Sequence, residues 1–101
     1  EKNITTGPEV TGLAVQNFHI KCTDLAKRAI QTLPQDQRNI TGLTLGISQQ
    51  AYDKICKEIL SFQDRIAEIV DGDSGSDRVY QMNFHLFPLS SNSTRTQEVE
   101  K

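Results

Sequence analysis

The stretch DRVYQMNFHLFPLS, residues 77–90, decides the fold that the sequence predicts. Apolar and polar side chains alternate along it, and this period of two is typical of a β-strand with one buried face. Two sets of side chains result: the apolar face carries Tyr80, Met82, Phe84 and Leu86, and the polar face carries Gln81, Asn83 and His85. Pro88 ends the strand, because proline cannot donate to a ladder of backbone hydrogen bonds. We therefore predict a strand over residues 79–87, with a polar face suited to recognition.

The same alternation predicts an earlier strand over residues 40–48, ITGLTLGIS. Leu43, Leu45 and Ile47 point to one side of this strand. Small residues, among them Gly42 and Thr44, point to the other side. A strand face built from such small side chains leaves room for another backbone or a ligand.

Two helices are predicted from apolar residues that recur with a period near 3.6. The first begins with a capping box made by Thr6 and Glu9, and it ends at Leu33 because a proline follows. The second begins after an N-cap at Ser48. It ends at Gly72, which we expect to adopt the left-handed conformation that is common after helices.

The order helix, strand, helix, strand predicts a two-layer α/β (or α+β) fold. The second helix, about 22 residues at 1.5 Å each, spans about 33 Å and returns the chain to the start of the first strand. The two strands should then be parallel with a right-handed crossover, and both long helices should lie on one face of the small sheet. Because parallel sheets rarely keep open faces and edges, we expect a second copy or a missing domain to complete the sheet.

The predicted boundaries are a linker over residues 1–5, a single α-β-α-β domain over residues 6–89 and a disordered tail over residues 90–101. The tail sequence, SSNSTRTQEVEK, has one valine as its only apolar residue and cannot repay the entropy of ordering. The chain also starts at Glu1 without a methionine, which suggests a fragment cut from a longer protein.

The composition of the 101 residues, 36% hydrophobic and 24% charged, is typical of a soluble globular domain. A net charge of −2 gives no basic surplus for phosphates, so we predict no direct nucleic-acid binding by this fragment. No apolar run reaches the roughly 18 to 20 residues of a membrane span, and a signal peptide is also absent. Cys22 and Cys56 fall on apolar helical stripes, and we interpret both as buried free thiols.

The outer face of the predicted sheet has three possible explanations. It is a solvated face, a polar interface with a partner copy or domain, or a small-molecule site. The candidate interface or ligand residues are Gly42, Thr44, Gln81, Asn83, His85 and Phe87.

No catalytic residues are predicted. A nucleophilic thiol needs a histidine within hydrogen-bond reach, and pairing either cysteine with His85 would require that cysteine to leave the core. The acidic loop DGDSGSD, residues 71–77, lacks the closing glutamate of an EF-hand. We therefore predict neither a metal ion nor a cofactor.

Three blocks of the sequence resemble a bacterial family first described as a Fibrobacter paralogous family, which is a domain of unknown function. The blocks are Phe18 and His19 in the first helix, residues 43–48 in the first strand and residues 80–89 in the second. The resemblance covers about residues 3–90. It implies that the chain is the carboxy-terminal half of a protein whose preceding half is similar to a winged-helix DNA-binding module.

These observations together predict a non-catalytic oligomerisation or regulatory domain of a cytoplasmic bacterial transcriptional regulator. Its expected partner is a second copy, in a homodimer, or its own N-terminal winged-helix domain, and it has no membrane association. The alternative is a small-ligand sensor domain in which Gln81, Asn83 and His85 contact an effector.

Overall fold

Two long helices form most of the chain, α1 over Gly7–Thr32 and α2 over Gln49–Asp71, with a short 3-10 helix, η2, at Gln35–Gln37. The computed structural model describes the backbone of residues 7–91 and the side chains of residues 11–91. Both predicted helices are confirmed at their expected places. The capping box of Thr6 and Glu9, most of the predicted tail and the predicted linker lie outside the described residues.

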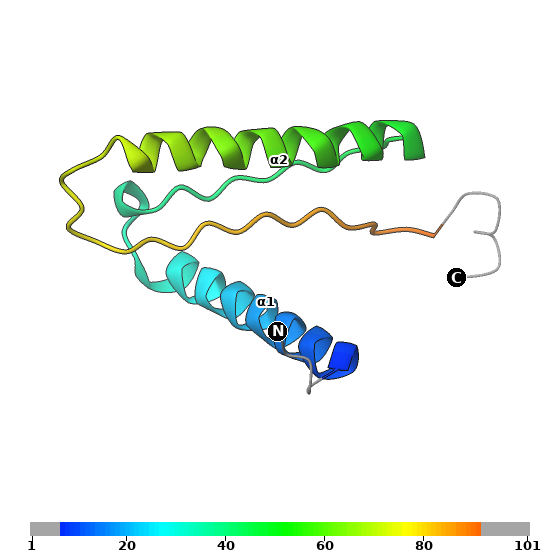
Figure 1. Ribbon diagram of the computed structural model, residues 1–101, viewed down its shortest axis with the longest axis horizontal. Coiled ribbons are helices and arrows are strands. Elements are labelled where there is room, and N and C mark those ends of the chain that lie inside the picture. Colours follow the sequence, from blue (N-terminus) through cyan, green and yellow to red (C-terminus); the bar gives the residue numbers. More distant parts are fainter. Residues whose placement is uncertain (1–6, 92–101) are drawn as a thin grey trace.

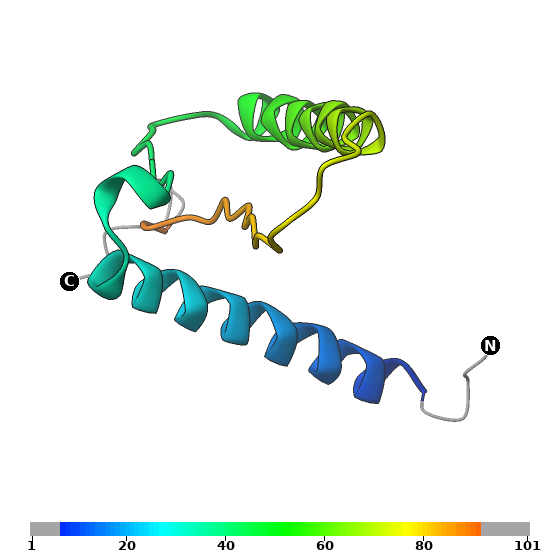
Figure 2. The same cartoon turned by 90° about the vertical axis from the view of Figure 1, so that its left-hand side faces the viewer.

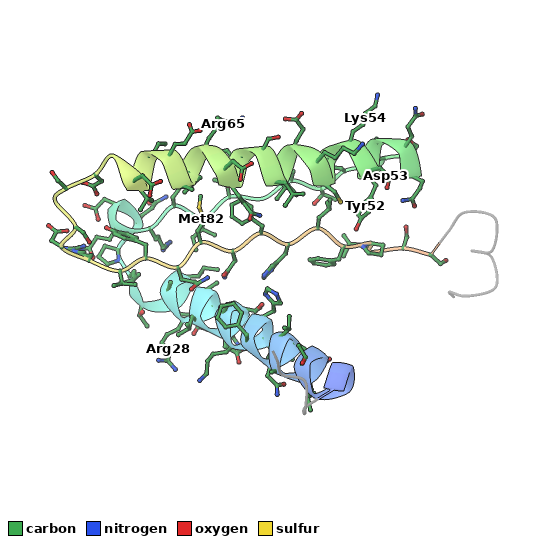
Figure 3. All side chains as sticks on the ribbon, in the orientation of Figure 1. Arg28, Tyr52, Asp53, Lys54, Arg65 and Met82 are labelled. Atoms are coloured by element: carbon green, nitrogen blue, oxygen red, sulfur yellow. The ribbon has the colours of Figure 1, made fainter. Side chains whose placement is uncertain are left out.

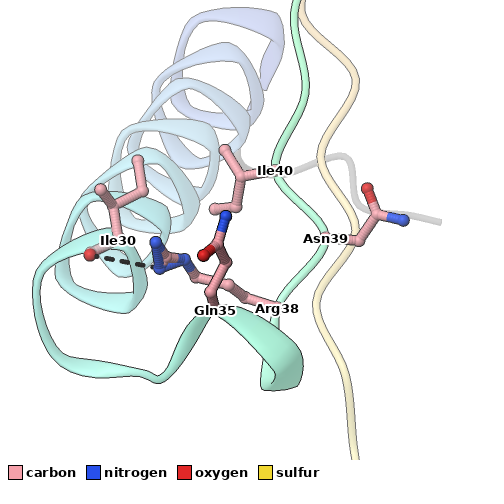
Figure 4. Close-up of a pocket in the computed structure, with 5 residues that line it drawn as sticks. All are labelled: Ile30, Gln35, Arg38, Asn39 and Ile40. Atoms are coloured by element: carbon pink, nitrogen blue, oxygen red, sulfur yellow. Dashed lines mark hydrogen bonds between the residues drawn. The ribbon is translucent and has the colours of Figure 1, made fainter.

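The end of α1 is held by a residue from beyond the helix. Its last turn contains no basic residue, yet its last carbonyl groups carry the negative end of the helix dipole. Arg38 supplies the missing cation: its Nη1 donates to the carbonyl oxygen of Leu33 at 3.2 Å and to that of Ile30 at 3.5 Å. Figure 4 shows this guanidinium in a hollow of about 430 Å³ that Gln35, Asn39 and Ile40 also line.

Each end of α2 has a specific cap. The Oγ of Ser48 accepts a hydrogen bond from the Ala51 N–H at 3.1 Å, as the sequence predicts. At the other end the helix stops at Gly72, but the predicted left-handed conformation is wrong, because its φ is −86°. The Gly72 N–H donates to Glu68 and the next N–H, of Asp73, donates to Val70, so the chain leaves α2 through a right-handed turn.

The predicted α/β fold with a parallel sheet is wrong. Within residues 7–91 the structure contains helices and no strand, so the described fold is all-α. Residues 40–47 and 79–87 carry no helix, but no backbone hydrogen bond joins them, and a strand exists only through such bonds to a neighbour about 4.8 Å away.

The two helices do not share one face, as the sequence predicts, but lie on opposite sides of the extended segment 79–87 (Figures 1 and 2). Two successive side chains of this segment contact different helices. Asn83 donates to the backbone of Cys22 in α1, and Phe84 meets Phe62 of α2 edge-on at a ring-centroid distance of 6.0 Å. The segment that was expected to pair with another strand is therefore packed between α1 and α2.

The core of the described residues is small. Cys22, in the middle of α1, is the one hydrophobic side chain among them that is fully buried, at 3% exposure. Met82 lies between segment 79–87 and α2, whereas Lys54 stands on the outer side of that helix (Figure 3). Several apolar side chains that were expected to be covered are instead exposed, Leu43 at 86% and Tyr80 at 75%.

Candidate functional site

A hollow of about 260 Å³ lies where segment 79–87 passes between the helices. Three predicted candidate residues, Gln81, Asn83 and His85, line it together. These three residues occupy alternate positions of the sequence, and an extended backbone turns every second side chain to the same side, so all three face the hollow. The other lining residues come from all three elements: Phe18 and His19 from α1, Gln63 from α2, and Met82 and Phe84 from the segment itself.

Asn83 has a structural role in this hollow. Its Nδ2 donates to the carbonyl oxygen of Cys22 at 3.0 Å, and its Oδ1 accepts from Nε2 of Gln81 at 3.1 Å. The side chain is half-buried, which makes a lost partner costly. Asn83 thus fixes segment 79–87 against α1, and its amide is already occupied rather than free for a ligand.

The remaining polar groups of the hollow are two imidazoles and one amide. The ring of His19 lies edge-on to the ring of Phe18, at 5.4 Å between centroids. The side chains of His85 and Gln63 make no hydrogen bond to any other described residue. Among the described side chains, no carboxylate, ammonium or guanidinium lines the hollow, so its chemistry suits a neutral group with hydrogen-bonding atoms and a flat apolar face.

The other three predicted candidates lie elsewhere. Gly42 and Thr44 belong to residues 40–47, and no described atom lies within 4 Å of the point where a Cβ of Gly42 would stand. Phe87 is 66% exposed beyond the end of the hollow. The six candidates therefore divide into Gln81, Asn83 and His85, which line the hollow, and Gly42, Thr44 and Phe87, which are exposed outside it.

Sequence reasoning missed the contributions of Phe18, His19 and Gln63 to the hollow. The sequence offered no reason to bring α1 next to the polar side of segment 79–87. One available signal was the pair of adjacent aromatic rings at Phe18 and His19, since the rest of the α1 sequence contains no aromatic residue. That signal marks a packing position without naming what packs there.

Within residues 11–91, no three or more His, Cys, Asp or Glu side chains are grouped so as to hold a metal ion. Cys22 and Cys56 are both free thiols, the first buried and the second half-buried. Hydrogen bonding with the Cys56 side chain raises the pKa of Tyr52 above its ordinary value of 10.0. None of the described helices is both long and apolar enough to cross a membrane.

Comparison with known proteins places the chain in a family. A family model described as a domain of unknown function, DUF4423, matches residues 1–89. No curated protein and no solved structure matches the chain significantly.

Proposed function

The chain belongs to the DUF4423 family of domains of unknown function, and we propose that it is a non-catalytic oligomerisation or regulatory domain of a bacterial transcriptional regulator. The observation that carries this proposal is the exposure of its apolar residues. Among the described residues, twenty-one large hydrophobic side chains are exposed, against one fully buried, Cys22. Apolar side chains scattered singly over a surface are ordinary, but so many around so small a core favour association, because large exposed apolar patches mark such sites.

The regulatory part of the proposal rests on the resemblance of three blocks of the sequence to the Fibrobacter paralogous family. In that family the corresponding segment follows a half similar to a winged-helix module. The present chain would then join two such modules, in the cytoplasm, while the modules contact DNA. Dimeric arrangement suits such a role, because two-fold symmetric regulators bind paired half-sites.

The solution mass of the 101-residue chain tests the proposal. Sedimentation equilibrium should give twice the 11.3 kDa of one chain, or a larger multiple, over the micromolar range. A mass of one chain at every concentration up to about 500 μM would overturn it, because an interface of standard size holds at that concentration.

A second candidate function is favoured by the hollow that His19, Gln81 and His85 line, and in it the domain senses a small neutral ligand. A ligand that binds only the folded chain raises its stability by about 2.7 kcal/mol at a hundredfold excess over Kd. For a domain of this size, that gain corresponds to a melting temperature about 10 °C higher. A thermal-shift screen with planar amides and purine-like heterocycles should then find such a shift.

His85→Ala should abolish any such shift, and Asn39→Ala, in the separate hollow at the end of α1, should leave it unchanged. A shift that survives His85→Ala would place the ligand outside this hollow. Absence of any shift over the whole screen would count against the sensor.

A further inference from the structure

The backbone N–H groups of two segments have no hydrogen-bond partner within the described chain. In residues 40–47 and 79–87, no backbone N–H donates to any described acceptor. Folded proteins pair nearly all such groups where they are shielded from water, and an extended segment with unpaired N–H groups is a template for pairing with another chain. These segments are therefore incomplete in the single chain.

Several apolar side chains of the same segments are also uncovered. Val79 is fully exposed at 100%, and Leu43 and Tyr80 are nearly so. At Gly42 and Gly46, no described atom lies within 4 Å of the point where a Cβ would stand, so another backbone can approach closely there. Apolar side chains beside bare backbone are what the centre of a protein interface requires.

The dimensions of the chain indicate how much surface awaits a partner. The accessible surface is 9197 Å², whereas a compact monomer of this mass exposes about 5,700 Å². The radius of gyration, 17.9 Å, likewise exceeds the roughly 13 Å of a compact domain of 100 residues. The excess, about 3,500 Å² per chain, is larger than the roughly 1,000 to 2,500 Å² that each partner of an obligate dimer buries, so it leaves ample surface for such an interface.

The lack of charged residues in these two segments indicates which kind of partner covers them. Neither segment 40–47 nor segment 79–87 contains Asp, Glu, Lys or Arg, although such residues make up 24% of the chain. In a two-fold dimer the same surface meets itself, so any charge near the axis would face its own copy. A surface without charge avoids this repulsion, and it therefore suits a second copy better than a charged partner.

We propose that a second copy of this chain covers residues 40–47 and 79–87, and that the extended segments of the two copies supply each other's backbone hydrogen-bond partners. This inference rests on the self-association proposed above and specifies its surface. It does not restore the parallel pair within one chain, because the two segments of each copy stay apart and the bonds run between copies.

Amide hydrogen exchange of the full 101-residue chain tests the inference. Since these amides have no acceptor in the described part of their own chain, we expect protection to come from the partner. At concentrations where the mass is that of a dimer, amides of residues 40–47 and 79–87 should exchange at least about a hundredfold slower than in an unstructured peptide.

Each other result has a defined meaning. A dimer whose 40–47 and 79–87 amides exchange at unprotected rates would overturn this inference but leave the oligomerisation domain standing, with another surface. A monomer would overturn both. Protection in a monomer would also overturn the inference, because the acceptors would then lie within one chain.

A matched pair of variants provides a second readout. Leu43→Lys places a charge on the proposed surface, and Leu60→Lys makes the same change at a comparably exposed position of α2, where Leu60 is 64% exposed. Both residues are exposed in the single chain, so neither change disturbs its own packing. Leu43→Lys should weaken dimerisation at least about tenfold, and Leu60→Lys should leave it within about twofold. Equal effects of the two variants would contradict the proposed surface.

Discussion

Asn83 connects two parts of the chain that lie 61 residues apart in the sequence. It donates to the Cys22 carbonyl of α1 and accepts from the Gln81 side chain, which uses both ends of its amide. Of the side chains of this size and shape, only an amide offers a donor and an acceptor together, because a carboxylate offers acceptors alone. The position of segment 79–87 against α1 therefore depends on residue 83 presenting a nitrogen donor, and not an oxygen, to the Cys22 carbonyl.

Asn83→Asp should lower the free energy of unfolding by about 1 to 3 kcal/mol at neutral pH. The change keeps the shape but turns a carboxylate oxygen toward the Cys22 carbonyl. The folded state then disfavours the charged form, so the pKa of the introduced carboxyl is raised. The loss of stability should be present above that pKa and should disappear as the pH falls below about 4, where the carboxyl is protonated in both states.

Urea unfolding at fixed chain concentration measures both effects, and Asn17→Asp on the exposed surface of α1 controls for the added negative charge. That control should change the stability by less than about 0.5 kcal/mol. A loss equally large in the control, or one independent of pH, would show that the Asn83 hydrogen bond is not its cause.

At this scale the sequence identified part of the hollow. Alternation placed Gln81, Asn83 and His85 on one side of an extended segment, and the structure brings all three to one hollow. The pattern could not tell what lies on that side. The sequence of α1 does not by itself indicate that this helix lies there, because the contact depends on Asn83, which is distant in the sequence. A period of two contains no information about such a neighbour.

At the scale of elements, the helices were predictable because their hydrogen bonds are local. Each N–H of a helix finds its acceptor four residues earlier, so periodicity and caps determine the element within a short window. The N-cap at Ser48 and the end of α2 before Gly72 were both readable in this way. The backbone conformation of Gly72 was not predictable in this way, since it depends on the direction that the following loop takes.

Ser48→Ala tests the contribution of that N-cap to α2. Removing the Oγ leaves the Ala51 N–H without its acceptor at 3.1 Å, which should lower the free energy of unfolding by about 1 kcal/mol. Ser61→Ala makes the same chemical change at an exposed interior position of α2, where alanine favours the helix and the stability should stay equal or rise slightly. Thermal unfolding followed by circular dichroism compares the two. Equal losses would contradict the capping role.

The strands failed for the converse reason. Alternation in residues 79–87 correctly indicated a segment with two distinct sides, but a strand also requires a partner, and the partner is not local. The sequence assigned residues 40–47 and 79–87 to each other because no further segment was available within the chain. The structure instead packs residues 79–87 between α1 and α2 through Asn83 and Phe84.

At the scale of the whole molecule, the described chain is extended and loosely packed. Its principal extents are 53 × 43 × 29 Å, and α1 alone, at 26 residues, spans about 39 Å of helix. Two helices of this length that meet mainly through one extended segment bury little apolar area for each residue they order. Ordering costs about 1 to 2 kcal/mol per residue for the backbone, so the proposed association would supply stability that this arrangement lacks in a single chain.

Thermal unfolding should therefore depend on the concentration of the chain. When folded dimers unfold to separate chains, dilution favours the unfolded state, and a tenfold rise in concentration should raise the melting temperature by about 4 °C for this size. Circular dichroism at about 5 and about 50 μM measures this shift. Leu43→Lys should melt at a lower temperature and show a weaker dependence over the same range, whereas Leu60→Lys should behave like the unmodified chain. Identical melting temperatures at both concentrations would mean that the single chain holds its fold unaided, despite its uncovered segments.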